Sequence, residues 1–110
     1  MAKGGFPMGG GNMQQLMRQA QKMQQDLQKK QAELNEATFT AQAGGGMVTV
    51  TVYGTKEVKS IELNPAIVDP EDPEMLQDLI VAGVNAAIRE ASEAVEREMG
   101  KLTGGMNLGF

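Results

Sequence analysis

The feature that most constrains this chain is a helical repeat near its N-terminus. Between residues 12 and 37 neither Gly nor Pro occurs, and residues that favour helices predominate. Apolar side chains recur at spacings of three and four, the a/d pattern of a coiled coil. This row, named here the apolar seam, comprises Met13, Leu16, Ala20, Met23, Leu27, Leu34 and Ala37, with Lys30 in one slot. The helix would measure about 37 Å, too long for so small a domain to cover, so the seam predicts pairing with a second copy.

Both ends of the sequence differ from this helix in composition. Residues 1–11 and 103–110 are dominated by Gly, whose backbone is costly to order. Asn12 suits the N-cap position, and Gln15 three residues later completes a capping-box pattern. We therefore expect two flexible tails around a single domain over residues 12–102. A domain of this size buries only roughly 60–65% of its unfolded surface, which favours stabilisation by a partner subunit.

The middle of the chain alternates in the manner of β-strands. Residues 38–43 and 47–53 show period-2 patterns, and the three glycines at 44–46 between them provide a permissive turn. Residues 57–63 predict a third strand, although their alternation is imperfect. Short connections favour an antiparallel meander.

A second long helix is predicted after this sheet. Asp72 can cap it, Pro73 suits its first position, and Glu74 favours the positive end of the helix dipole. The helix is expected to run to about Gly100. The chain is thus predicted to be α+β, in the order helix, three-stranded antiparallel sheet, helix.

The composition excludes much chemistry. The 110 residues contain 14 acidic and 10 basic side chains and no His, Cys or Trp. Disulfides, thiolate zinc sites and the usual neutral-pH base are therefore excluded, and Ser60 and Ser92 have no base to activate them. We expect no metal and no cofactor, and an enzyme relying on carboxylates alone is the weakest hypothesis. No secretory or membrane-spanning segment is evident, so a cytoplasmic location without membrane contact is predicted.

Two other clusters have simple structural interpretations. The glycine triplet at 44–46 could be a phosphate-binding loop, but such a loop requires Lys, then Ser or Thr, then a helix. Here Met47 follows and opens a strand, so a hairpin turn is the preferred interpretation. The acidic cluster Asp69, Glu71, Asp72 and Glu74 lacks the spacing of a calcium loop. The chain has nine Met residues, and those on the first helix, Met13, Met17 and Met23, are most simply adaptable packing, with a client-binding groove as the alternative.

The most informative pattern is a row of cations on the first helix, named here the basic stripe: Arg18, Lys22 and Lys29. These residues lie within roughly 40° of one another around the helix and opposite the apolar seam. Residues 1–36 carry five basic and three acidic groups, for a net charge of +2, and the remainder carries five basic and eleven acidic groups, for −6. Such a stripe could neutralise phosphates, or it could be an ordinary solvated face.

Three segments together resemble one family. They are NMQQLMRQAQKMQQDLQKKQAEL at 12–34, AGGGMVTVTVYGTKEVKSIEL at 43–63 and EDPEMLQDLIVAGVNAAIREASEAVEREMGKLTGG at 71–105. In order and spacing they are similar to the YbaB/EbfC family of nucleoid-associated proteins. The resemblance implies a tweezer-like homodimer that binds DNA with loose sequence preference, contributes to nucleoid organisation and to recombination, repair or gene regulation, and has no catalytic motif.

The leading hypothesis is therefore a non-enzymatic homodimer that binds double-stranded DNA in the nucleoid, with no small-molecule substrate. The predicted DNA contacts are Arg18, Lys22 and Lys29, with help from Lys3 and Lys30. The predicted dimer interface comprises Leu16, Met23, Leu27, Val50, Leu76, Leu79, Ile80 and Val84. The alternative is a protein-binding adaptor or holdase that uses the Met-bearing helices.

Overall fold

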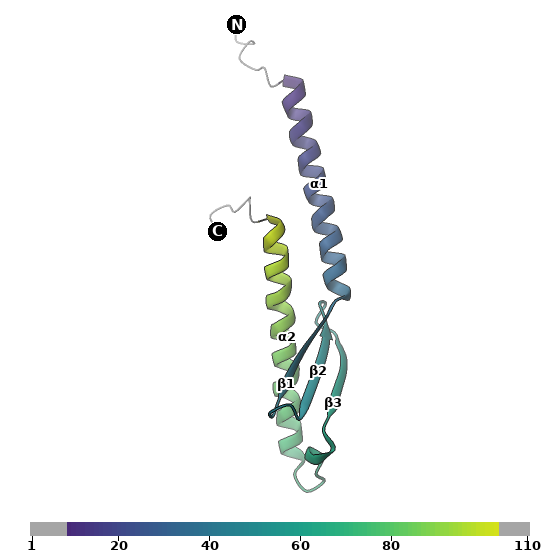
Figure 1. The fold of residues 1–110 in the computed structure, drawn as a ribbon, viewed down its shortest axis with the longest axis vertical. Coiled ribbons are helices and arrows are strands. Elements are labelled where there is room, and N and C mark those ends of the chain that lie inside the picture. Colours follow the sequence, from purple (N-terminus) through teal and green to yellow (C-terminus); the bar gives the residue numbers. More distant parts are fainter. Residues whose placement is uncertain (1–8, 104–110) are drawn as a thin grey trace.

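A computed structural model describes residues 9–103 of the chain. Two long helices accompany a three-stranded sheet in an elongated molecule (Figure 1). The predicted α+β class and element order are confirmed. The elements are α1 (Gly9–Glu36), β1 (Thr38–Ala43), β2 (Val48–Tyr53), β3 (Val58–Leu63), the short 3-10 helix η2 (Pro65–Ile67) and α2 (Pro73–Thr103).

The sheet is an antiparallel meander in the order β1-β2-β3. The glycine triplet forms the first turn, and Gly44, Gly45 and Gly46 all have positive φ, a backbone region that Gly enters without steric penalty. Strand β2 pairs along its whole length with β1, from Val48 opposite Ala43 to Tyr53 opposite Thr38. The first two predicted strands and the turn between them are therefore confirmed.

The imperfect alternation of the third strand has a structural cause. Val50 pairs with Ile61, but Val52 pairs with Val58, so two residues of β2 match three of β3. The extra residue is a β-bulge, which breaks the period-2 pattern while keeping apolar side chains on one face of the sheet.

The core lies between this sheet face and α2. Val48, Val50 and Val52 are fully buried, and they cluster with Ile67, Ala87 and Ala91. Helix α2 packs on β1 and β2 and approaches the sheet closely at Gly83, where a Cβ atom would lie 2.9 Å from Val50 Cγ2. The small residues of α2 thus set how near the helix lies to the sheet.

The start of α2 follows the prediction. The Met75 amide donates a 3.2 Å hydrogen bond to Asp72 Oδ1, and Pro73 is the first helical residue. This is an N-cap, which satisfies one of the amides that a helix start leaves unpaired. At its other end α2 extends to Thr103, three residues beyond the predicted end.

The start of α1 differs from the prediction. The helix begins at Gly9, so Asn12 lies inside it and is not the N-cap. Once a helix is nucleated, each further residue adds a hydrogen bond, and Gly opposes this extension by only about 1 kcal/mol. Residues 9–11, expected to belong to a tail, and Thr103 are therefore helical, while the rest of both predicted tails lies outside the described residues.

The last turn of α1 is attached to the sheet. The Gly54 amide, in the β2–β3 turn, donates a 3.0 Å hydrogen bond to the Ala37 carbonyl. A Cβ atom at Gly54 would lie within 2 Å of the Leu34 carbonyl oxygen, so only Gly fits there. The junction between helix and sheet is thus a close backbone contact.

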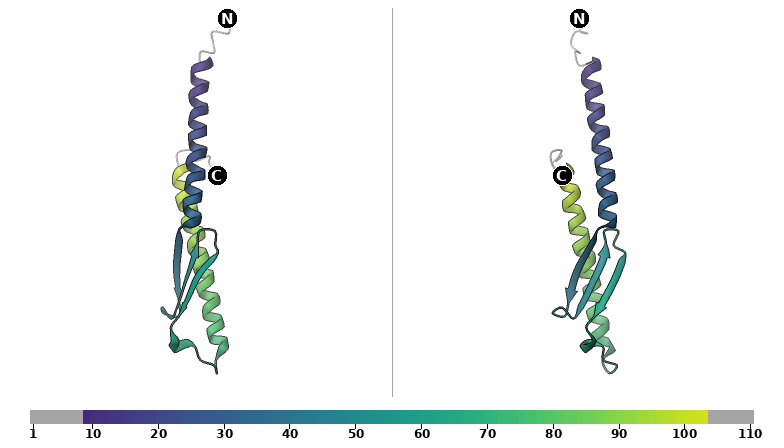
Figure 2. Two further views of the ribbon diagram at one scale, coloured as in Figure 1. Left: turned by 90° about the vertical axis from the view of Figure 1, so that its right-hand side faces the viewer. Right: turned by 45° about the vertical axis from the view of Figure 1, so that its right-hand side comes forward.

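The two halves of α1 have different surroundings. The C-terminal half lies beside the end of α2, whereas the N-terminal half extends beyond it (Figures 1 and 2). Leu34 is buried, and every residue from 12 to 22 is exposed. The chain's own α2 therefore covers the C-terminal half of the seam, and pairing with a second copy stays a prediction for the N-terminal half.

Candidate nucleic-acid interface

The basic stripe lies on the exposed surface of α1. Arg18, Lys22 and Lys29 are all exposed, and Arg18 and Lys22 belong to the half that extends beyond α2. None of the three is in an ion pair among residues 9–103. At 1.5 Å per residue, the stripe spans about 16 Å of helix. Its charges are therefore available to an external anion.

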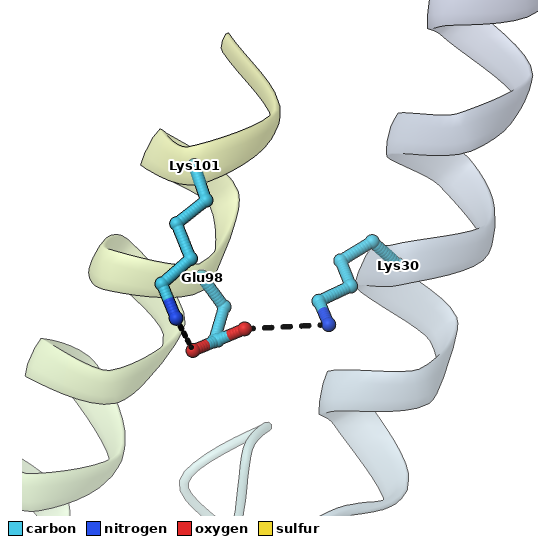
Figure 3. Close-up of polar contacts among 3 residues, drawn as sticks. All are labelled: Lys30, Glu98 and Lys101. Carbon is cyan, nitrogen blue, oxygen red and sulfur yellow. Dashed lines mark hydrogen bonds and ion pairs between the residues drawn. The ribbon is translucent and has the colours of Figure 1, made fainter. Parts of the chain in front are cut away.

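Lys30 has a different environment from the one predicted. Its Nζ atom lies 3.3 Å from Glu98 Oε1 on α2, and the other carboxylate oxygen of Glu98 lies 2.9 Å from Lys101 Nζ (Figure 3). Lys30 is thus turned toward α2 and does not join the outward stripe, as its slot in the seam explains. Hydrogen bonds from Lys101 and then Lys30 hold the pKa of the Glu98 carboxylate below its ordinary value.

The remaining predicted DNA contacts are less uniform. Lys29 borders a surface hollow that it shares with the carboxylates of Asp26 and Glu33 and with the end of α2. Nearby acids weaken the attraction of a cation for phosphate, so Arg18 and Lys22 form the strongest part of the stripe. Lys3 lies outside the described residues.

Charge is also separated along the molecule. Residues 12–25 contain Arg18 and Lys22 and no acidic side chain, whereas residues 69–78 contain five acidic side chains and no basic one. The two segments lie toward opposite ends of the elongated fold (Figure 1). A polyanion is therefore attracted to the free end of α1 and repelled from the loop that precedes α2.

The acids at that loop have local structural roles. Asp69 Oδ1 accepts a 2.9 Å hydrogen bond from the Glu71 amide, and Asp72 caps α2. Within residues 9–103, no group of three or more His, Cys, Asp or Glu side chains is placed to hold a metal ion. In the same part of the chain, no helix has the length and apolar character needed to cross a membrane.

The predicted interface residues lie in three environments. Leu16 is 59% exposed, while Met23 and Leu27 are half-buried near the end of α2. Leu76, Leu79 and Val84 are partly buried against the chain's own core, and Ile80 is half-buried on the same helix. The prediction for Val50 is wrong, because this residue has no exposed surface and lies under α2 in its own chain.

Three apolar residues missed by the sequence analysis are left uncovered. Val58 and Ile61 pair with core residues of β2 and yet are 40% and 39% exposed, because α2 covers β1 and β2 and leaves most of β3 open. Val81 on α2 is 57% exposed. The strand pattern could have identified Val58 and Ile61, but the bulge hid their common face.

Comparison with known proteins identifies the class of this fold and surface. A family of DNA-binding proteins, the YbaB/EbfC DNA-binding family, matches residues 8–106. A nucleoid-associated protein of Alkaliphilus metalliredigens (strain QYMF) is 62% identical over 98% of this chain and 96% of its own length. Another nucleoid-associated protein, from Acetivibrio thermocellus, is 57% identical over 96% of this chain and 94% of its own length.

A solved structure shares the fold. The crystal structure of an uncharacterized protein, HP0035 from Helicobacter pylori, covers 84% of this chain and 94% of its own, with a TM-score of 0.60 and 24% sequence identity. The chain belongs to the YbaB/EbfC DNA-binding family. The family resemblance seen in the sequence is thereby confirmed.

Proposed function

We propose that this chain is a non-enzymatic nucleoid-associated protein that binds double-stranded DNA as a homodimer with loose sequence preference. In the cytoplasm it would contribute to nucleoid organisation and, through that, to recombination, repair or gene regulation. The observation that carries the proposal is the basic stripe, whose cations are exposed and unpaired among residues 9–103.

The stripe favours phosphate contact over base reading. Arg18 and Lys22 lie one helical turn apart among neutral Gln side chains, so the surface offers charge without an arrangement of aromatic stacking groups. Contacts to phosphate carry little sequence information, which supports loose preference. The net charge of −4 opposes tight binding, so we expect modest affinity.

The salt dependence of DNA binding tests the proposal. If the three stripe cations of each copy neutralise about six phosphates per dimer, the slope of log K against log salt concentration is near −5. A gel-shift series in rising salt measures this slope. A flat response would contradict phosphate binding by the stripe.

A triple variant locates the contact. We expect Arg18→Ala/Lys22→Ala/Lys29→Ala to lose at least tenfold in DNA affinity and most of the salt slope, because each contact releases counterions. The matched control, Lys59→Ala/Arg89→Ala/Arg97→Ala, removes the same charge from exposed positions elsewhere and is expected to retain the slope. Equal losses in both variants would assign the effect to net charge and not to the stripe.

The homodimer is supported by apolar surface that the chain leaves open. Val58 and Ile61 on β3 and Val81 on α2 would be covered by the same surface of a second copy, as a two-fold interface requires. Burial of such side chains is worth about 25 cal/mol per Å² of apolar area. In this proposed dimer interface, Val58, Ile61 and Val81 take the place of Val50, which is fully buried in its own chain and has no surface to bury against a second copy.

A second candidate is a protein-binding adaptor or holdase. The observation that favours it is the exposed apolar set on the free half of α1, Met13, Leu16 and Met17, since Met side chains adapt to varied partners. Client binding of this kind would persist in high salt, whereas DNA binding would not. A light-scattering assay of an aggregating client protein in high salt separates the two functions.

A further inference from the structure

We propose that the free half of the apolar seam, which carries Met13, Leu16, Ala20 and Met23, binds the same four residues of a second molecule in antiparallel orientation. This contact is separate from the β3–α2 surface of the proposed homodimer. Its consequence for DNA, the joining of two bound duplexes, rests on the function proposed above.

The seam is already a helix-packing surface within one chain. Its C-terminal half packs beside α2, and Leu34 is buried there. Leu27 and Met23, which precede Leu34 along the seam, are half-buried. The same row of apolar residues continues past the end of α2, where Leu16 is 59% exposed and Met13 57% exposed. A hollow lined by Leu16, Gln19, Ala20 and Met23 follows this row. The natural occupant of such a row is another helix.

The position of α2 selects the orientation of that helix. In a parallel pair, the seam residues from 27 to 34 of both copies would face each other, but α2 occupies this space in each chain (Figure 2). In an antiparallel pair with seam contacts over residues 13–23, the second helix begins at Gly9, opposite residue 27, and so reaches only the level of the end of α2. Leu16 then faces Ala20 of the second copy, and Met13 faces Met23, as a positions face d positions in antiparallel pairs.

The charges of α1 favour a second copy of this chain over a charged partner. Apart from Arg18 and Lys22, the polar residues from 12 to 25 are all Asn or Gln, so no like charges meet across the contact. Arg18 and Lys22 lie opposite the seam and would face outward on both helices. Two basic stripes would thus be directed away from each other, toward separate DNA segments.

The contact is small. The overlap of residues 13–23 covers about 15 Å of helix, or about three turns. Two faces of this length bury less surface than the roughly 1,200 Å² of a stable interface. In free solution we therefore expect weak association. Molecules held on DNA have a much higher effective concentration, which makes a weak contact sufficient to join two duplexes.

The absence of Cys from the chain allows a direct test by cross-linking. We would oxidise the full-length variants Leu16→Cys and Ala20→Cys separately and as an equal mixture, without DNA. We expect the mixture to form at least fivefold more of the 16–20 disulfide than of either homotypic disulfide. A predominance of the 16–16 product, or equal yields of all products, would overturn the antiparallel contact.

A chain without residues 104–110 tests whether this segment, and not a second molecule, covers the hollow at the free half of the seam. If residues 104–110 occupy the hollow, the 16–20 disulfide will appear only after these residues are removed, and that result would overturn the proposal. Equal yields with and without residues 104–110 would support it.

The DNA consequence has its own readout. Immobilised duplex should retain a second, labelled duplex with the wild-type protein, and Ala20→Gln should reduce this recovery at least fivefold without changing the gel shift. Gln21→Ala, on the side of α1 away from the seam, is the matched control and should behave as the wild type. If the wild-type protein gives no gel shift but the 16–20 disulfide forms, the proposed function is wrong and the contact between seams remains. If Ala20→Gln recovers as much labelled duplex as the wild type, bridging through the seam is overturned.

Discussion

Gly83 and Gly100 both lie in α2, and their environments are opposite. A Cβ atom at Gly83 would meet Val50 Cγ2 at 2.9 Å and Val48 Cγ1 at 3.2 Å, so the helix could not stay at its present distance from the sheet. At Gly100 nothing lies within 4 Å. The first glycine is thus required by packing, whereas the second only adds backbone entropy to the unfolded chain.

This difference predicts opposite effects of the same substitution. Gly83→Ala should destabilise the fold by about 1–3 kcal/mol, because overpacking displaces core side chains. Gly100→Ala should stabilise it by about 0.5–1 kcal/mol. Urea unfolding followed by circular dichroism measures both. Two changes of the same sign would contradict the close approach of α2 to β2.

Glu98 gives a pH-dependent prediction. Its pKa is held below the ordinary 4.5 by hydrogen bonds from Lys101 and Lys30, so its stabilising contribution is complete above 4.5 and is lost as the pH falls through the folded pKa. We expect Glu98→Gln to lower the unfolding temperature at pH 7, and the difference from the wild type to shrink as the pH is lowered below 4.5 and Glu98 becomes protonated. Glu96→Gln is the control, since Glu96 is exposed and in no ion pair among residues 9–103. A gap between wild type and Glu98→Gln that does not shrink as the pH is lowered would exclude the charge pair as its cause.

At the scale of elements, local patterns determined most of the fold. Strand alternation, the glycine triplet and the Asp72-Pro73 start of α2 act over a few residues, and the structure confirms each of them. The bulge in β3 was visible only as a broken pattern, because its meaning depends on the register with β2.

The surroundings of α1 were harder to predict. A 3–4 repeat indicates that a helix has an apolar face but not which helix covers it. Consequently the cover supplied by α2 and the pairing of Lys30 with Glu98 were missed, although Lys30 in an apolar slot was a signal of a nearby acid. The exposure of Arg18 and Lys22 follows from their position opposite the seam and agrees with the helical pattern.

At the scale of the whole molecule, the uncovered residues of β3 and α2 predict the assembly. Val81→Lys places a charge in the proposed two-fold contact, where desolvation of a charge is costly. We expect at least a hundredfold weaker self-association, measured by sedimentation or light scattering. Gln77→Lys, an exposed change one turn earlier on α2, is the control for added charge. An unchanged mass for Val81→Lys would place the dimer contact elsewhere.

The unsupported length of α1 also governs what the protein can reach. From residue 26, which borders a hollow with Leu102 at the end of α2, to residue 12 the helix runs about 21 Å, and all of its residues there except the half-buried Met23 are exposed. A bend of about 10° there would move the tip by roughly 4 Å, comparable with the roughly 3.4 Å of duplex axis per phosphate of one strand. Small flexing of this projecting rod would therefore let the same two cations follow a duplex whose curvature or groove width varies.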